Sequence, residues 1–303
     1  MQKVLITGCA GFIFSHVTDY LLEEGYEVVG LDNLSQGSHP ELIPIWEELG
    51  MTFHKIDVAD KEVIDLIINE DPDYIIHAAA YSDVDGSIKN AHDIIQKNCD
   101  ATINVFEAAR QIPDLKKLVY ISTDEIYGEC THRKAEGEIL FPKNPYSFSK
   151  ACGSLLRLAY DNTYPELKDK TAETRFCNVI GERQDDRKIL PRIKRALETG
   201  DPVPVHNGGT GYREYIWVDN IPPAVEQIML NGDRVYNITN NDGFTVNELI
   251  DTVEYITNKK VPVAVGDRPG MDEKYQMCSF RIKDELGWTP TVLFAEGLHK
   301  YLC

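Results

Sequence analysis

A run of three polar side chains has the types that acid–base chemistry needs. Thr123, Asp124 and Glu125 follow the apolar stretch 117–122, which we expect to be a buried strand. Ligands of an open parallel sheet bind where its strands end. The run therefore predicts a hydroxyl and two carboxyl groups at a ligand-binding edge.

A second pair, Tyr146 and Lys150, lies four residues apart and so shares one face of a helix. A tyrosine normally titrates near pH 10, and a nearby ammonium group favours its phenolate form. Alone, such a pair is more often a solvated helix face, and adjacent carboxylates after a strand more often begin a turn. Both groups follow a dinucleotide-type opening, however, and this order predicts a catalytic site.

That opening is a short β-branched run, residues 3–7, followed by a glycine-rich turn and a helix reaching about Glu24. Glycines allow close backbone approach, and a helix N-terminus offers free N–H groups to a pyrophosphate. The predicted contacts come from Gly8, Gly11, Phe12 and Ile13.

A second strand, 27–31, ends in Asp32 and Asn33, at the spacing where an acid binds the adenosine ribose hydroxyls. Because that acid would repel a 2′-phosphate, the pattern favours NAD over NADP. Phe14 occupies the position of the usual third glycine, and we expect its ring to pack in a shifted helix–sheet interface.

Strands and helices continue to alternate. We expect strands at 52–56 and 74–77 and helices at 61–69 and 91–111, which predicts an α/β fold with a doubly wound parallel sheet. His77 fits a core histidine. Further cofactor contacts are expected after these strands, from Asp57, Val58, Ala78, Ala79 and Ala80.

The pattern loosens after Asn178, where Pro and Gly become frequent and strands shorten. We expect an NAD-binding Rossmann domain made of residues 1–177 plus about 212–238, the latter returning to the main sheet. A smaller α+β lobe, 178–211 plus 239–303, would bind the substrate.

The composition of the 303 residues narrows the classes of partner. A net charge of −18 argues against nucleic acid or an anionic membrane, and no apolar run of about 18 residues or leader is present. Seven scattered cysteines, none in Cys-x-x-Cys spacing, argue against disulfide and metal frameworks. We expect a cytoplasmic protein.

These motifs resemble the extended short-chain dehydrogenase/reductases. More narrowly, they are similar to the nucleotide-sugar 4,6-dehydratases, of which dTDP-glucose 4,6-dehydratase is the best known. The similarity covers nearly the whole chain, and the Thr-Asp-Glu run is its specific element, because related epimerases and decarboxylases usually lack the acid at 124. It rests on Thr7-Gly8-x-x-Gly11, the run 122–128, Tyr146-x-x-x-Lys150, Asp267-Arg268-Pro269-Gly270-x-Asp272 and Glu285-Leu286-Gly287-Trp288-Thr289-Pro290.

The resemblance implies a mechanism. Tyr146 takes the proton of the sugar 4-hydroxyl, held by Thr123, while NAD accepts the C4 hydride. Glu125 then removes the C5 proton, and a protonated Asp124 donates a proton to the departing C6 hydroxyl. The hydride returns to C6, so the cofactor is regenerated and held tightly.

The resemblance also implies the remaining contacts. Asn98 joins the cofactor site, and the lobe binds the nucleotide diphosphate of the sugar. The family commonly has Glu, His and Arg where this chain has Tyr81, Asp83 and Gly86, so the sugar or its substituents can differ. The implied substrate-binding residues are Ser82, Asn178, Lys188, His206, Arg213, Asn247, Arg268 and Tyr275.

Two alternatives stay open. One is a nucleotide-sugar 4-epimerase or decarboxylase of the same fold, and the other is a catalytically silent nucleotide-binding protein. As in the family, we expect a homodimer built through a four-helix contact of segments 91–111 and 146–163.

Overall fold

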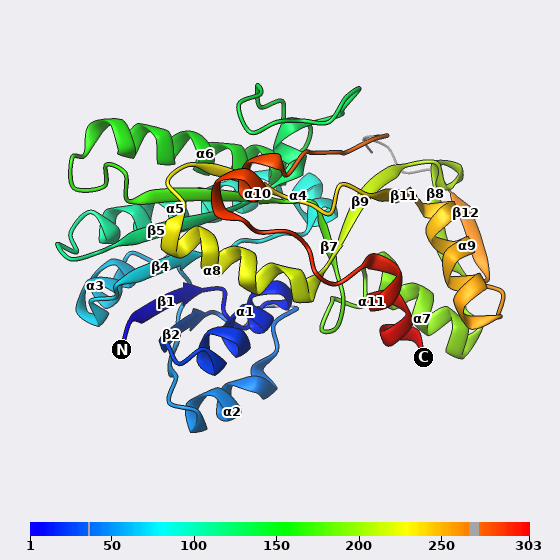
Figure 1. Ribbon diagram of the computed structural model, residues 1–303, viewed down its shortest axis with the longest axis horizontal. Helices are drawn as coiled ribbons and strands as arrows, with labels where there is room; N and C mark the ends of the chain where they lie inside the picture. Colours follow the sequence, from blue (N-terminus) through cyan, green and yellow to red (C-terminus); the bar gives the residue numbers. More distant parts are fainter. Residues whose placement is uncertain (36, 267–272) are drawn as a thin grey trace.

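The computed structural model describes residues 1–35, 37–266 and 273–303 (Figure 1). Its main sheet has seven strands, and every neighbouring pair in it is parallel. Across the sheet the order is β10 (Val235–Ile238), β6 (Thr171–Phe176), β5 (Lys117–Thr123), β4 (Tyr74–His77), β1 (Lys3–Thr7), β2 (Glu27–Asp32) and β3 (Thr52–Lys55). The predicted doubly wound fold is confirmed.

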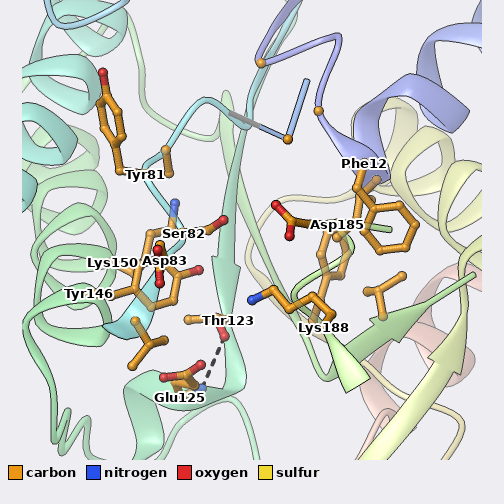
Figure 2. A pocket seen from close by; sticks show the side chains of 18 of the residues that line it. Phe12, Tyr81, Ser82, Asp83, Thr123, Glu125, Tyr146, Lys150, Asp185 and Lys188 are labelled. Atoms are coloured by element: carbon orange, nitrogen blue, oxygen red, sulfur yellow. Dashed lines mark hydrogen bonds between the residues drawn. The ribbon is translucent and has the colours of Figure 1, made fainter. Parts of the chain in front are cut away.

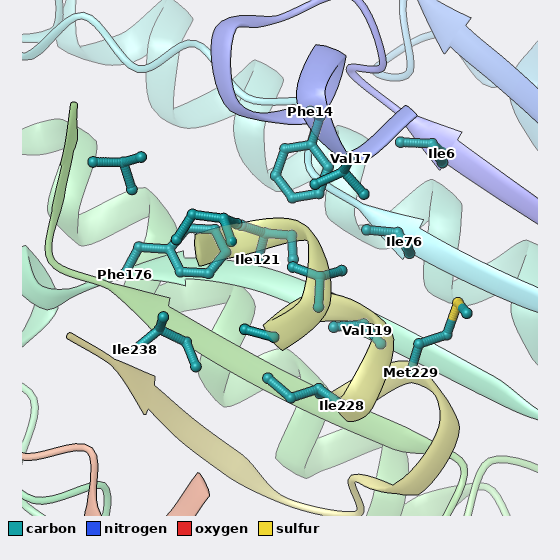
Figure 3. Packing of buried hydrophobic residues seen from close by; sticks show 14 of the residues in the cluster. Ile6, Phe14, Val17, Ile76, Val119, Ile121, Phe176, Ile228, Met229 and Ile238 are labelled. Atoms are coloured by element: carbon teal, nitrogen blue, oxygen red, sulfur yellow. The ribbon is translucent and has the colours of Figure 1, made fainter. Parts of the chain in front are cut away.

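Alternating side chains of the strands bury both faces of this sheet. On β1, Val4 and Ile6 join one apolar cluster, whereas Leu5 between them joins another. Figure 3 shows the first cluster, in which helices α1 and α8 cover the strands. Fully burying such an aliphatic side chain contributes about 1.5–3 kcal/mol, so both faces must be covered.

Two groups of helices provide that cover. The first cluster takes side chains from α1 (Phe12–Glu23), α2 (Ile43–Glu48), α8 (Ile221–Asn231) and α10 (Phe280–Leu286). The second takes them from α3 (Glu62–Glu70), α5 (Ala91–Ala109) and α6 (Pro145–Thr163), and the short α4 (Val84–Lys89) precedes α5.

The chain order of the strands creates a switch point at β1. From β1 the chain builds outward through β2 and β3, then returns to place β4, β5 and β6 on the other side. In such sheets the crevice at the carboxyl ends beside the switch point is where ligands bind. Gly8 follows β1 at this edge, and Asp124 follows β5.

A separate apolar core holds the smaller lobe together. It takes side chains from the helices of the lobe and from two short sheets, β11 (Gly243–Thr245) with β9 (Tyr212–Trp217) and β7 (Asn178–Ile180), and β12 (Val263–Gly266) with β8 (Val203–His206). The helices of the lobe are α7 (Ile189–Thr199), α9 (Val246–Thr257) and α11 (Phe294–Leu302).

The segment 212–238 divides between the two sheet systems. We expected all of it to return to the main sheet, but β9 pairs with β7 and β11 in the lobe. Only α8 and β10, its second half, join the main sheet and its cover. The apolar residues at the end of β9, Tyr215 to Trp217, suit either sheet, so the sequence pattern could not distinguish them.

Phe14 packs in the interface between α1 and the sheet, as expected. Its side chain is 5% exposed, and its ring centroid lies 6.5 Å from that of Phe176 on β6. Figure 3 shows the ring between α1 and the strands. The missing third glycine is thus replaced by an aromatic contact in the core.

Candidate active site

The turn between β1 and α1 forms one wall of the site. Gly8 has a φ of +74°, and a Cβ built on it would lie 2.9 Å from the Cα of Ala79. The position therefore requires glycine, both for its left-handed backbone and for the close approach of two strand ends. Helix α1 begins at Phe12 with no side-chain cap, so its first N–H groups suit an anion.

Asp32 closes this turn from the end of β2. Its Oδ2 accepts a hydrogen bond from the Ala10 N–H at 3.0 Å, and its Oδ1 accepts one from the Leu34 N–H at 2.8 Å. The carboxyl group is thus fixed beside the glycine turn, where it lines the cavity.

Asn33, Asp57 and Tyr81 form a polar group next to Asp32. The Asn33 amide donates to Asp57 Oδ2 at 3.0 Å, and the Tyr81 hydroxyl donates to the same oxygen at 3.1 Å. We expected Tyr81 beside the hexose, but its side chain points away from Thr123 and Tyr146 (Figure 2). It belongs to the edge formed by β2 and β3 because these two polar partners lie there.

The residues after β4 are held by buried hydrogen bonds. The Ala78 and Ala79 N–H groups both donate to Thr7 Oγ1, at 3.2 and 3.1 Å. His77 lies 2.8 Å from the same oxygen and is 1% exposed; burial lowers its pKa to about 3. It is a core histidine, as expected. Asn98 anchors the next turn by accepting from the Tyr81 N–H at 2.8 Å.

The three residues after β5 lie in different environments. Thr123 and Glu125 line the cavity, and the Thr123 hydroxyl donates to Asp124 Oδ1 at 3.2 Å. Asp124 is 4% exposed, and its Oδ2 has no hydrogen-bond partner among the described residues. Burial, with the charge of Glu125 beside it, raises the pKa of Asp124 from 3.8 to about 8. Burial thus favours the protonated form of Asp124.

Glu125 is held by a residue that the sequence analysis missed. The Asn144 side chain donates to Glu125 Oε2 at 2.9 Å and also caps α6 by accepting from the Ser147 N–H at 2.8 Å. One amide thereby ties the carboxylate to the helix that carries Tyr146. Asn followed by Pro is a typical helix start, so Asn144-Pro145 was a sequence signal that could have identified this residue.

Tyr146 and Lys150 share one face of α6, as predicted, and both line the cavity. Lys150 is 5% exposed, with its Nζ 4.4 Å from the ring centroid of Tyr120. Burial lowers the pKa of Lys150 to about 7, although the charge of Glu173 opposes this. Figure 2 shows Tyr146, Lys150 and Thr123 around one space.

The Tyr146 phenol differs from expectation in its protonation. Burial raises its pKa above the ordinary 10, the charges of Glu125 and Asp124 add to this, and the Thr123 hydroxyl opposes it. We expected Lys150 to bring the phenol into working range. Burial and the charges of the two carboxyl groups oppose that effect, so the lowering of the Tyr146 pKa by Lys150 stays a prediction.

The lobe provides the opposite wall. Lys188 extends its ammonium group into the space that Thr123 faces (Figure 2). The Arg213 guanidinium lies over the ring of Tyr275, 4.5 Å from the centroid, and His206 lines the same region. His206 Nδ1 is buried, and the described residues offer it no hydrogen-bond partner.

A single cavity of about 840 Å³ joins these walls. Of the described residues that we predicted for the site, Asp124 and Asn247 do not line it. Asp124 lies behind Thr123, and the Asn247 amide donates instead to the Gly208 carbonyl oxygen at 2.9 Å. Arg268 lies outside the described residues. The predicted residues that do line it are Gly8, Gly11, Phe12, Ile13, Asp32, Asn33, Asp57, Val58, Ala78, Ala79, Ala80, Ser82, Asn98, Thr123, Glu125, Tyr146, Lys150, Asn178, Lys188, His206, Arg213 and Tyr275.

The described part of the chain lacks two further features. No cluster of three His, Cys, Asp or Glu side chains there could hold a metal ion. None of its helices combines the length and the apolar character needed to cross a bilayer.

Comparison with known proteins identifies relatives along the whole chain. The model of the NAD dependent epimerase/dehydratase family matches residues 4–239. The low-salt glycan biosynthesis protein Agl12 of Haloferax volcanii is 34% identical, with 98% of this chain and 96% of that protein covered. The dTDP-glucose 4,6-dehydratase of Neisseria gonorrhoeae is 31% identical, covering 99% and 94%.

Solved structures agree with this similarity. DesIV, a dTDP-glucose 4,6-dehydratase from Streptomyces venezuelae with NAD bound, matches with a TM-score of 0.91 and 30% identity, covering 99% of this chain and 96% of that one. A UDP-glucose 4-epimerase from Thermotoga maritima with UDP-glucose gives the same TM-score and identity, covering 99% and 97%.

Proposed function

This chain belongs to the NAD dependent epimerase/dehydratase family, and we propose that it is a nucleotide-diphosphate-hexose 4,6-dehydratase acting on a dTDP-glucose-like substrate. The observation that carries this proposal is the difference in surroundings between Asp124, which is buried, and Glu125, which lines the cavity. Dehydration needs an acid and a base in one site, and the raised pKa of Asp124 keeps a proton available beside Glu125.

The residues present fit NAD, the cofactor of this family. The glycine turn leaves room that a Cβ at Gly8 would fill, and the Asp32 carboxyl group lies beside it, where it would bind the adenosine ribose. Lys150 would hold the nicotinamide ribose. When bound, NAD supplies a hydride acceptor for C4 and the hydride that returns to C6.

In the proposed reaction, Tyr146 takes the proton of the sugar 4-hydroxyl, and Thr123 accepts or donates a hydrogen bond at the same oxygen. The phenol must lose its proton against a raised pKa. A positive charge beside it favours the phenolate, and a protonated Lys150 on the same helix face supplies one.

The elimination steps use the two carboxyl groups. Once C4 is a ketone, the C5 proton is acidic, and Glu125, held by Asn144, removes it. Asp124 supplies the proton that leaves with the C6 hydroxyl as water. Its only described hydrogen bond, at Oδ1, joins it to the Thr123 hydroxyl at the cavity wall.

The lobe would bind the nucleotide diphosphate. Lys188 and Arg213 bring positive charge to the cavity wall, and charge-assisted hydrogen bonds from such groups suit phosphate oxygens. Asn178 borders the sugar end, and His206 and Tyr275 would meet the nucleobase. This assignment implies two functional units: residues 1–177 with α8 and β10 for the cofactor, and the remaining residues, β9 with Arg213 included, for the substrate.

Incubating the protein with dTDP-, UDP-, CDP- and GDP-hexoses tests the proposal. We expect loss of one water from at least one of them and a 4-keto-6-deoxy product, as in deoxysugar biosynthesis. The similarity to a UDP-glucose 4-epimerase makes 4-epimers the most informative other product. Epimers or pentoses without dehydration would replace the dehydratase by an epimerase or a decarboxylase.

A further inference from the structure

The segment between β7 and α7, residues 181–188, crosses the cavity from one flank to the other. Its members Gln184, Asp185, Arg187 and Lys188 line the cavity, together with the glycine turn that follows β1. In Figure 2, Asp185 lies near Phe12, whereas Lys188 points toward Thr123. We call residues 181–188 the strap.

The strap contains a rigid turn of its own. Asp185 Oδ1 accepts from the Arg187 N–H and from Arg187 Nε, both at 2.8 Å, and Oδ2 accepts from Nη2 at 2.8 Å. The Asp185 carbonyl oxygen also accepts from the Lys188 N–H at 2.8 Å. The bidentate pair therefore fixes the direction of the Arg187 side chain and the backbone that carries Lys188.

One end of the strap is bound to the α1 side of the cavity. His16 Nε2 lies 3.0 Å from the Glu182 carbonyl oxygen, and His39 Nε2 lies 2.8 Å from that of Arg183. The Arg183 guanidinium also pairs with Asp19 at 2.7 Å. These contacts hold the first half of the strap against the helix that follows the glycine turn.

The other end is bound to the α4 side through one ion pair. Arg187 Nη1 lies 3.0 Å from Asp83 Oδ2, while Asp83 Oδ1 accepts from the Gly86 N–H at 3.1 Å and so caps α4. Both side chains are partly exposed, at 43% and 44%. The resemblance gives His at position 83 and Arg at position 86, where this chain has Asp and Gly. The cation beside position 83 is here Arg187, which comes from the opposite wall of the cavity.

We propose that residues 181–188 form a strap that retains the dinucleotide, and that Asp83 and Arg187 are positioning residues that fasten it. The inference rests on the proposed function only in taking NAD as the ligand. The strap joins the lobe to the α1 side of the cavity, beside the glycine turn, and to the α4 side. Release of a ligand lying along the glycine turn therefore requires at least one of these attachments to open.

The test measures the rate at which NAD leaves the holoenzyme, with no nucleotide sugar present. Asp83→Asn removes the charge but keeps an oxygen that can cap α4, and Arg187→Gln removes the guanidinium. Each variant is expected to release NAD about two- to fivefold faster, the effect of a partly exposed ion pair. The double variant is expected to be no faster than the faster single variant, because both changes break one contact.

Two controls distinguish loss of the Asp83–Arg187 contact from a general loosening of the protein. Arg234→Gln removes another exposed arginine, paired with Asp233 outside the cavity lining, and is expected to leave the release rate unchanged. Raising the salt from about 0.05 to 0.5 M screens exposed pairs, so release from the wild type should accelerate while release from Asp83→Asn stays nearly flat.

Unchanged release in both single variants, or additive effects in the double variant, would overturn the proposal. A protein that retains NAD but dehydrates no hexose refutes the proposed reaction and leaves the strap intact. A protein that binds no NAD refutes both.

Discussion

Asp124 and Glu125 are adjacent in sequence, yet the first carboxyl group is buried and the second lines the cavity. Asp124 is buried behind the threonine, and Glu125 lines the cavity in contact with Asn144. The short 3-10 helix Asp124–Tyr127 produces this separation, because it turns successive side chains in different directions. Two carboxyl groups of similar intrinsic acidity thus lie in different surroundings, and burial raises the pKa of Asp124.

Replacing Asp124 by Asn should separate the two halves of the proposed reaction. Asparagine has no proton to give the departing hydroxyl, so water elimination should slow by about 10²–10⁴, the usual contribution of a general acid. Oxidation at C4, which uses Tyr146, should change much less. Single-turnover absorbance of NADH and mass spectrometry of the sugar measure the two steps, and equal losses in both would contradict the role of Asp124.

The pH dependence of dehydration provides an independent test of Asp124. Because its pKa is raised to about 8, the carboxyl group is protonated below that pH and loses its proton above it. Dehydration limited by this acid should therefore decline as the pH rises through about 8. The profile of the Asp124→Asn variant should lack that decline, and a variant that keeps it would assign the titration to another group.

Lys150 should promote the reaction, whereas its burial should lower the free energy of unfolding. Its pKa falls from 10.5 to about 7 on burial, so the unfolded chain binds more protons between these values. Stability from this residue is present above pH 10.5 and lost as the pH falls through 7. Lys150→Met should raise the free energy of unfolding at pH 6 by at least about 1 kcal/mol, the equivalent of one pKa unit.

Urea denaturation at pH 6 and pH 10.5 measures this effect, and the gain should shrink at the higher pH. The same variant should lose most of its turnover, because it lacks the ammonium group beside Tyr146. A variant destabilised at pH 6 would show that the lysine charge is better compensated than its burial indicates.

Local sequence patterns correctly predicted the main sheet and the face of α6 that carries Tyr146 and Lys150. The continuous apolar run of β1 and the spacing of Tyr146 and Lys150 are short-range properties, and each is visible in a few residues. The contact between Asp83 and Arg187 spans 104 positions, and no periodicity encodes it. The direction of Tyr81 was missed for the same reason, since its partner Asp57 comes from another strand end.

Phe14 replaces the usual third glycine, and its contribution to the free energy of unfolding can be measured. Its ring fills the space between α1 and the sheet, against Phe176. Phe14→Ala should therefore leave a cavity and lower the free energy of unfolding by about 3–5 kcal/mol. Phe141→Ala, at a side chain 66% exposed, is the matched control and should cost little. Urea denaturation of both variants gives the comparison, and similar small losses would mean that the interface collapses around Phe14.

The outer face of α5 and α6 leads to a prediction about assembly. Leu155 and Leu158 on α6 are 58% and 46% exposed, and Ile103 on α5 is 39% exposed. Helix pairs with such a face commonly bury it against a second copy by two-fold symmetry. If the chain forms the homodimer that we propose, Leu155→Arg places two charges in that contact and should yield a monomer by light scattering at micromolar concentration. Leu49→Arg, at an equally exposed leucine after α2, should remain dimeric. A wild type that is already monomeric, or a Leu155→Arg variant that stays dimeric, would place the contact elsewhere or remove it.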